Sequence, residues 1–241
     1  MLFRSAKEAA NGISCTNNLK QIGLAQAGYS SDFDDWIVPG CIYADMDSSA
    51  RSYYSYYSCI WFGLLSGYSP NGRPLTSGYG TELVNLTGKT AGTFACPSEP
   101  AKFGSVPDTF GYTHYGINIF LSGVSNKQGD VTEVHRRVTS VRSASQAWLI
   151  ADSLTMETYM LCQVHWPAFR HGNPDPRPRD RTHISPVSNN GKCNFLFMDG
   201  HVSGATYPEF RTWGKDLVIP AVTFQSTYNN RRQFVCGFDL K

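Results

Sequence analysis

The sequence lacks a long apolar run. No stretch reaches the length of about eighteen apolar residues that a membrane-spanning helix needs. The first thirty residues mix polar and apolar types, so no signal peptide is evident. Net charge is also small, because 21 basic and 19 acidic side chains leave +2. That balance gives no long-range attraction to nucleic acid, and we expect no nucleic-acid partner.

Familiar catalytic patterns are missing as well. The sequence contains no Gly-x-Ser-x-Gly elbow, no phosphate-binding glycine loop and no dinucleotide fingerprint. We therefore expect a protein that is not an enzyme, with no catalytic or cofactor-binding residues. A secreted hydrolase that uses two facing carboxylates is kept as a lesser alternative, because such pairs leave no sequence signature.

The seven cysteines are scattered and form no Cys-x-x-Cys pair. This spacing argues against a zinc ribbon or finger, which usually shows close pairs. An oxidising compartment would allow up to three disulfides and leave at least one thiol. In a reducing compartment the cysteines would act as small buried apolar residues. The sequence leaves both alternatives open and does not reveal which cysteines pair.

What is present indicates an α+β protein with a long N-terminal helix. Residues 2–30 show apolar positions three to four residues apart, as on one face of a helix. These positions are Leu2, Ala6, Ala9 and Ile13, continued by Leu19, Ile22 and Tyr29. Residues 31–241 predict a globular head built mostly from antiparallel strands, on which the helix packs. The two expected parts are therefore 1–30 and 31–241.

Within the head, several segments predict particular elements. An aromatic run over 51–67 favours a short buried helix, in which Tyr53 to Tyr57 and Trp61 belong to the core. Residues 145–152 are the best candidate for a central strand, and shorter strands are expected at 94–98, 110–120, 162–169 and 217–219. The Pro/Arg run at 173–181, with Arg177, Arg179 and Arg181, predicts an exposed loop.

Residues 194–202 predict a β-hairpin. We expect two short strands joined by a two-residue type I′ turn at Asp199 and Gly200, because both central positions of that turn need positive φ. Gly reaches positive φ freely and Asp tolerates it. The segment alone predicts a hairpin and no function.

Five landmarks in order resemble the pseudopilin-like proteins of the DUF1559 family, over about residues 5–205. They are the segment around Cys15, Asn18, Leu19, Lys20 and Gln21; Cys96, Pro97 and Ser98; Tyr115, Gly116 and Asn118; the strand ending at Asp152; and the hairpin with Asp199, Gly200 and His201. The family's usual motif places His nine residues before Asp-Gly, but position 189 is Asn here. His171 matches the start of that motif, displaced by the Pro/Arg run, and His183 is the other candidate.

The resemblance implies a pilin-like fold and a structural role. Family members carry a prepilin-type processing site and a segment of roughly twenty apolar residues, long enough to span a bilayer. Neither is found here, so we expect that the chain begins inside a longer gene product; the alternative is a member that has lost membrane insertion. Without the apolar segment, the head alone is expected to be a soluble monomer. The implied function is a non-enzymatic subunit of a type II secretion-like pseudopilus or surface filament. It would be exported to the cell envelope, assembled through its helix and handled by inner-membrane assembly machinery.

Two further interpretations concern ligands. Asp199 and His201 could take part in a calcium site, as in the major pseudopilins, but one Asp with backbone carbonyls is a thin ligand set and a plain hairpin turn is preferred. Asp199, His201 and His183 are the weak metal candidates, and no cofactor is otherwise expected. The rival function is a helix-anchored surface module that holds polysaccharide through the Tyr-rich run.

Overall fold

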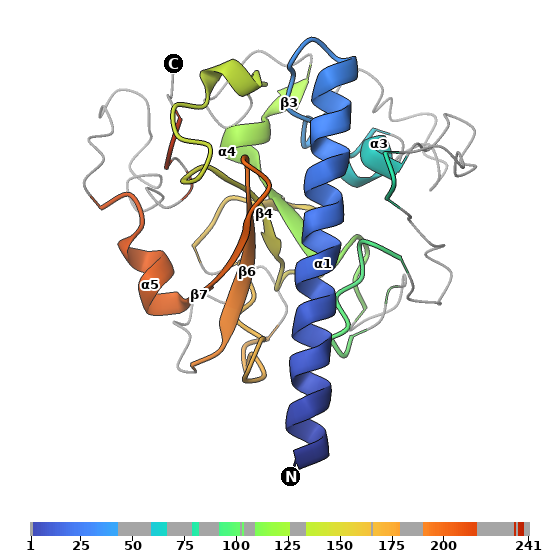
Figure 1. Ribbon diagram of the computed structural model, residues 1–241, viewed down its shortest axis with the longest axis vertical. Coiled ribbons are helices and arrows are strands. Elements are labelled where there is room, and N and C mark those ends of the chain that lie inside the picture. The colour runs from blue at the N-terminus through green and yellow to red at the C-terminus, as the bar shows by residue number, and fades with distance from the viewer. Residues whose placement is uncertain are drawn as a thin grey trace.

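The computed structural model describes residues 2–42, 59–66, 79–81, 92–101, 103, 109–125, 134–164, 166–178, 190–215, 234 and 236–238. The fold is α+β, as predicted: one long N-terminal helix packs against a head whose main sheet has five strands and is mostly antiparallel (Figure 1). In the described part of the chain, no helix combines the length and the apolar character needed to cross a membrane.

Helix α1 spans Leu2–Asp32. Its buried face follows the helical period of three to four residues, and the apolar residues on it are Cys15, Leu19, Ile22, Ala25 and Tyr29. The helix is followed by a turn in which Asp34 and Asp35 have φ of 46° and 62°. A short polar side chain tolerates this left-handed region better than most, so the chain can leave the helix sharply here.

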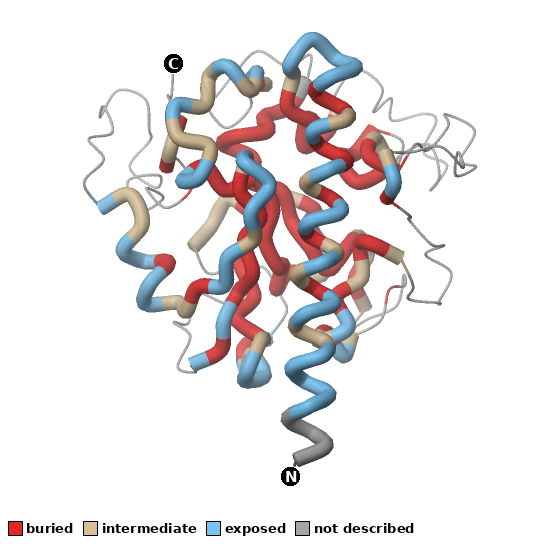
Figure 2. The backbone as a smooth tube through the Cα atoms, in the orientation of Figure 1, coloured by how far each residue is buried: buried red, intermediate tan, exposed pale blue. Residues whose placement is uncertain are grey.

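The first half of the predicted apolar stripe is not buried, so the prediction was wrong for these residues. Ala6, Ala9 and Ile13 are exposed, and the side chain of Ile13 keeps 64% of its surface accessible. The first turns of α1 project past the edge of the head (Figure 1), so the alanines have no sheet to cover them. Ile13 lies level with the docked residues, but it is about 200° round the helix from the buried Cys15 and therefore faces away from the head. Figure 2 shows the change along the helix, which is mostly exposed near its N-terminal end and has a buried face farther along.

The five-stranded sheet has the strand order β5-β2-β4-β6-β7. Its strands are β2 (Tyr115–Asn118), β4 (Trp148–Asp152), β5 (Met160–Leu161), β6 (Lys192–Phe197) and β7 (Val202–Thr206). Strand β4 lies in the middle and all its residues are buried, which confirms the central strand predicted over 145–152. All neighbours are antiparallel except β2 and β5, which run parallel.

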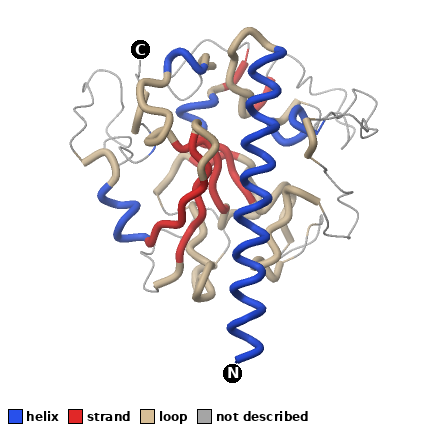
Figure 3. Tube along the Cα trace, viewed as in Figure 1, coloured by secondary structure: helices blue, strands red, loops and turns tan. Residues whose placement is uncertain are grey.

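Helix α1 lies on this sheet beside β6 and β7 (Figure 3). A glycine allows the close approach: a Cβ on Gly23 would lie 2.9 Å from Leu196 Cδ1 of β6. The helix and the sheet therefore bury their apolar faces against each other, which is the usual arrangement of an α+β layer.

The predicted hairpin is present, but its turn differs. Gly200 N–H donates to Phe197 O and Phe197 N–H donates to His201 O, each over 2.9 Å. Gly200 has φ of 85°, whereas Asp199 keeps a negative φ. These features make a type I turn followed by a left-handed glycine, so the prediction of a two-residue type I′ turn was wrong. The Asp199 carboxylate accepts the backbone N–H of His201, which favours the longer loop.

The remaining elements are short. They are β1 (Cys41–Ile42) and β3 (Val124–Ser125), which form a parallel pair, and the helices α3 (Trp61–Ser66), α4 (Ile119–Ser122), η2 (Val138–Ser140) and α5 (Tyr207–Thr212). Helix α3 confirms the end of the helix predicted over 51–67, and Trp61 is buried as expected. Tyr53 to Tyr57 and the strand predicted at 217–219 lie outside the described residues.

Two other predicted strands are wrong. Residues 94–98 form turns and irregular chain, because their N–H groups bond to other partners: Cys96 N–H donates to His114 Nδ1. No strand lies among the described residues of the segment 162–169, because β5 (Met160–Leu161) ends before it begins. Past β5 the chain turns, and Pro167 makes only an isolated bridge to Ser153. Proline has no N–H to donate, so a continuous ladder is not available there.

Candidate functional site at the helix–head junction

A disulfide joins α1 to the head. It links Cys15 with Cys96, both buried, across a Cα–Cα distance of 5.1 Å and a sequence separation of 81 residues. The oxidised alternative therefore holds for this pair, whereas the other five cysteines carry thiols. The two landmark segments that contain these cysteines are far apart in sequence and meet here.

Hydrogen bonds on both sides of the disulfide hold the same loop against the helix. Asn18 donates its side-chain amide to Ala95 O over 2.8 Å, and Asn11 donates to Pro97 O over 3.1 Å. The Ser98 hydroxyl lies 3.8 Å from Cys15 Sγ. The side-chain amides thus satisfy backbone carbonyls of a loop that has no strand partner, which explains why Asn occurs at these helical positions.

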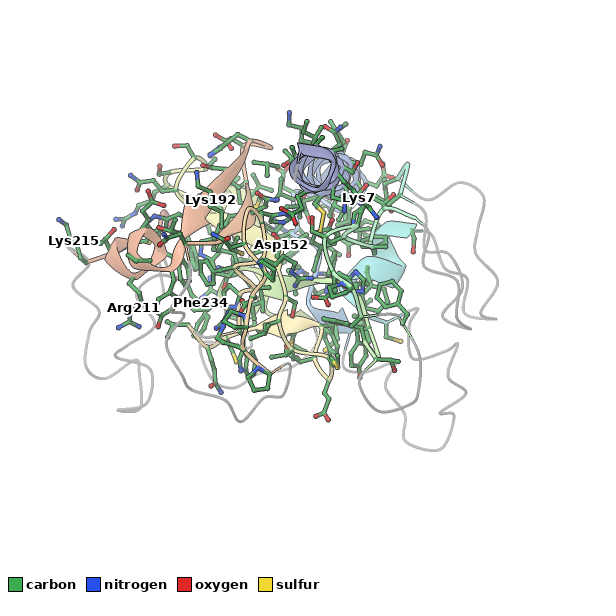
Figure 4. All side chains as sticks on the ribbon, turned by 90° about the horizontal axis from the view of Figure 1, so that it is seen from below. Lys7, Asp152, Lys192, Arg211, Lys215 and Phe234 are labelled. Atoms are coloured by element: carbon green, nitrogen blue, oxygen red, sulfur yellow. A yellow bond between two sulfur atoms is a disulfide. The ribbon has the colours of Figure 1, made fainter. Side chains whose placement is uncertain are left out.

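Below the disulfide lies a buried carboxylate, Asp152, at the end of β4. Its Oδ2 accepts the backbone N–H of Asn194 over 2.8 Å and lies 2.9 Å from His171 Nε2. The pairing of Ala151 with Phe195 brings the end of β4 level with Asn194 on β6. Figure 4 looks along α1 from its N-terminal end and places Asp152 in the interior of the head, below the helix.

His171 connects this carboxylate to the disulfide. One of its ring nitrogens and the sulfur atoms of Cys15 and Cys96 all lie within 4.8 Å of one another. Its side chain is 10% exposed, and its Nδ1 lies 3.9 Å from the position that a Cβ on Gly12 would occupy. Nε2 therefore faces Asp152 and Nδ1 faces α1.

A buried ion pair completes the junction. Arg170 NH1 lies 2.7 Å from Glu99 Oε2, both side chains are 3% exposed, and Arg170 also donates to Ser153 O. The sequence did not predict that Arg170 and Glu99 form an ion pair. The available signals were their neighbours, since Glu99 directly follows the Cys-Pro-Ser segment and Arg170 directly precedes His171. Neither signal reveals that the two segments meet.

The electrostatics keep the nearby thiol and phenol protonated. Burial raises the pKa of the Cys193 thiol, and the negative charge of Asp152 raises it further. Burial raises the pKa of the Tyr115 phenol in the same way, again with a contribution from Asp152. A thiol with a raised pKa is a poor nucleophile. Cys193 is therefore an inert buried group that donates to the Asp152 carbonyl oxygen over 3.7 Å.

Beside the disulfide a cavity of about 420 Å³ opens toward solvent. Its wall includes Ser14 and Asn18 of α1 and Cys96, Pro97 and Glu99 of the loop. Cys96 therefore forms part of the wall of this cavity, although its own exposed fraction is only 1%.

Other landmark residues have structural places elsewhere. Leu19 is in the core, whereas Lys20 and Gln21 are exposed on α1. Asn118 caps α4 by accepting Phe120 N–H, and it donates to Trp148 O and Phe234 O. Gly116 lies in β2, where a Cβ would come within 2.6 Å of Leu161 Cγ. His183 lies outside the described residues.

Asp199, Gly200 and His201 form the hairpin tip, apart from the junction. Asp199 Oδ1 accepts from the backbone N–H of His201 and lies 2.5 Å from its Nδ1. Burial opposes the shift, but these bonds lower the pKa of the Asp199 carboxyl. These hydrogen bonds hold the turn through its own Asp199 side chain, in keeping with the preferred interpretation of a plain hairpin turn. Calcium binding there was the less favoured interpretation and stays untested.

The Pro/Arg run is not wholly an exposed loop. Arg177 is buried, donates to Asp175 and to Pro167 O, and lies with its guanidinium 5.7 Å from the Phe169 ring centroid. The prediction was wrong for this residue because a carboxylate two residues earlier in the chain neutralises it. Arg179 and Arg181 lie outside the described residues.

No curated protein and no solved structure matches the chain. Residues 4–61 match a family model described as "Protein of unknown function (DUF1559)". The matched segment contains α1 with Cys15, Asn18 and Gln21, so it includes the helical side of the junction. The match confirms the family resemblance read from the sequence: over residues 4–61, this chain carries the pattern of the DUF1559 family.

Proposed function

We propose that the chain is a non-enzymatic, pilin-like subunit of a type II secretion-like pseudopilus or related surface filament. The observation that carries the proposal is α1, a helix of 31 residues whose later part is docked on a β-sheet head while its beginning projects beyond that head. Residues 6–10, in the projecting part, are all exposed, so a neighbouring helix is the natural partner for this end of α1.

The exposed face of α1 supports this assignment. Ile13 and Leu24 are 64% and 73% exposed. Three turns of an α-helix take up about eleven residues, which is their separation, so both side chains point in nearly the same direction. Alanines at positions 6, 9 and 27 are also exposed on α1. At 100° per residue these alanines lie within about 40° of Ile13 around the helix axis, so they flank the two large apolar side chains on the same face, and small residues there suit close packing of helices.

In this proposal each part of the molecule has a mechanical role. Helices of neighbouring subunits bundle through the Ile13 and Leu24 face, and the heads tile the outside. The Cys15–Cys96 disulfide and the Asn18 and Asn11 hydrogen bonds fasten the head to its own helix. Localisation in the cell envelope, assembly as a homo- or hetero-oligomer and handling by inner-membrane assembly machinery belong to the same proposal.

The proposal is tested by photo-crosslinking in the cells that produce the protein. A photoreactive amino acid is placed at Leu24, at Ile13 and, as a control, at Arg211, which is exposed on α5. Illumination should give ladders of crosslinked subunits from Leu24 and Ile13, enriched in the fraction of sheared surface fibres, and far less from Arg211.

Monomers at all three positions, or equal yields at all three, would contradict a filament built through this face. A monomeric chain that instead co-sediments with cell-wall polysaccharide would favour the alternative of a helix-anchored binding module.

A further inference from the structure

We propose that Cys15, Cys96 and His171 form a zinc site when their disulfide is reduced, so that the helix–head junction is held by a covalent bond in one redox state and by a metal ion in the other. The site is independent of the proposed filament role. It joins two sulfur ligands from different segments to one imidazole, all within 4.8 Å of one another.

His171 is already oriented as a ligand. Asp152 Oδ2 lies 2.9 Å from Nε2, and because a carboxylate only accepts, this hydrogen bond places a proton on Nε2 when the ring acts as a neutral ligand. The lone pair is then on Nδ1, which faces α1 and is buried without a hydrogen-bond partner among the described residues. A histidine that is bonded to a carboxylate through one nitrogen and ligates through the other is a common arrangement at metal sites.

The supporting carboxylate is itself held in place. Asp152 is fully buried and also accepts the Asn194 N–H over 2.8 Å, so it has little freedom to turn away from His171. The Ser98 hydroxyl lies 3.8 Å from Cys15 Sγ, where it can donate to a thiolate. The surroundings of the three ligand atoms are therefore formed before any metal arrives.

Charge selects the kind of ion. Sulfur and imidazole ligands suit Zn²⁺ or Cu⁺. Two thiolates with Zn²⁺ are neutral together, whereas two thiolates with Cu⁺ leave one negative charge in a buried place. The fixed charges close by are Asp152 and the Arg170–Glu99 pair, which already sum to one negative charge. A further buried charge of the same sign is costly, so Zn²⁺ is favoured.

The redox step needs a dithiol reductant. The sulfur–sulfur bond of Cys15 and Cys96 breaks, and the two cysteines receive two electrons and two protons. The reductant supplies both, and its own dithiol is oxidised to a disulfide. Zn²⁺ then replaces the two thiol protons, which are released. Access is through the 420 Å³ cavity, because Cys96 is part of its wall. Three protein ligands leave a fourth position for water.

The test compares the oxidised chain with the chain reduced by dithiothreitol, from which the dithiothreitol is then removed under anaerobic conditions. Zinc binding is measured by competition with a chromophoric chelator. The reduced chain should bind one Zn²⁺ more than the oxidised chain, and since the other five cysteines carry thiols in both samples, the difference reports on Cys15 and Cys96. Co²⁺ used as a probe should give thiolate charge-transfer absorption in the reduced chain alone.

Variants separate the ligand from its support. His171→Ala should weaken zinc binding to the reduced chain at least about tenfold and alter the Co²⁺ spectrum, and Asp152→Asn should weaken it about 10- to 100-fold. His201→Ala is the matched control, because that exposed histidine at the hairpin tip lies outside the site, and it should leave binding unchanged.

Equal zinc binding by the oxidised and reduced wild-type chains would overturn the proposal without any variant. So would a reduced chain that loses its circular dichroism signal and takes up no zinc, or tight binding that survives His171→Ala.

Discussion

Buried charge is the most informative feature at the scale of single residues. Asp152, Arg170 and Arg177 all lie inside the head, and each is matched by a hydrogen-bond donor or an opposite charge. Arg136 is another case, since burial lowers its pKa to about 10 while its guanidinium donates to Phe120 O. Breaking such pairs leaves one charge uncompensated, and this is more destabilising than losing a surface pair.

Asp175 makes stability depend on pH. Burial opposes the shift, but hydrogen bonds and the charge of Arg177, with the Phe169 N–H, lower the pKa of the carboxyl below its ordinary 3.8. Its contribution to stability is therefore complete above that ordinary value and is lost as the pH falls through the lower folded value. We expect the free energy of unfolding in urea to fall as the pH is lowered through this window.

The Asp175→Asn variant should show a shallower dependence on pH in the same window. It should also be less stable at neutral pH by about 3–5 kcal/mol, because Arg177 then stays buried without its carboxylate. Parallel curves for the two proteins below pH 4 would rule out Asp175 as the source of the slope.

At the scale of elements, α1 has two kinds of apolar residue. Leu19 is fully buried against the head, whereas Leu24, on the same helix, is 73% exposed. The Leu19→Ala variant should lose about 2–5 kcal/mol of unfolding free energy, because a cavity remains in the core. Leu24→Ala should change stability by no more than about 0.5 kcal/mol. Urea unfolding of the two variants side by side checks this, and similar losses would mean that both faces are buried.

The disulfide supports the docking of α1. It closes a loop of 81 residues, and the loss of chain entropy in the unfolded state predicts about 4 kcal/mol of stabilisation. A Cys15→Ser, Cys96→Ser double variant should be less stable by roughly that amount in guanidinium, in the absence of zinc. Reduction of the wild-type chain should give a similar loss, and an unchanged midpoint in both would show that the hydrogen bonds of Asn18 and Asn11 suffice.

For the whole molecule, the uneven docking of α1 predicts uneven stability. Residues 6–10 of the helix are all exposed, whereas from Cys15 onward one face of the helix is buried against the head. A helical segment without tertiary contacts is marginal in water. By mass spectrometry, amide hydrogens in peptides covering 2–12 should exchange much faster than those covering 18–30. Filament assembly should slow the first group, and equal rates in the free chain would contradict the described docking.

The sequence already contained much of this architecture. The helical period of α1, the apolar run that became β4 and the two strands of the hairpin were all predicted, because each depends on local residue pattern. The order of the landmark segments also predicted the family that residues 4–61 match. Cys15, Cys96, Asp152 and His171 were named from those landmarks, although no pattern indicated that they converge.

Only the tertiary structure decided which side chains come into contact. Pairing of Cys15 with Cys96 depends on how α1 lies across a loop 81 residues away, and periodicity contains no such information. The exposure of Ile13, the burial of Arg177 and the turn at Gly200 were settled by packing against distant elements and by local side-chain bonds. Local propensities are encoded within a few residues, whereas burial, charge compensation and disulfide pairing are properties of the assembled fold.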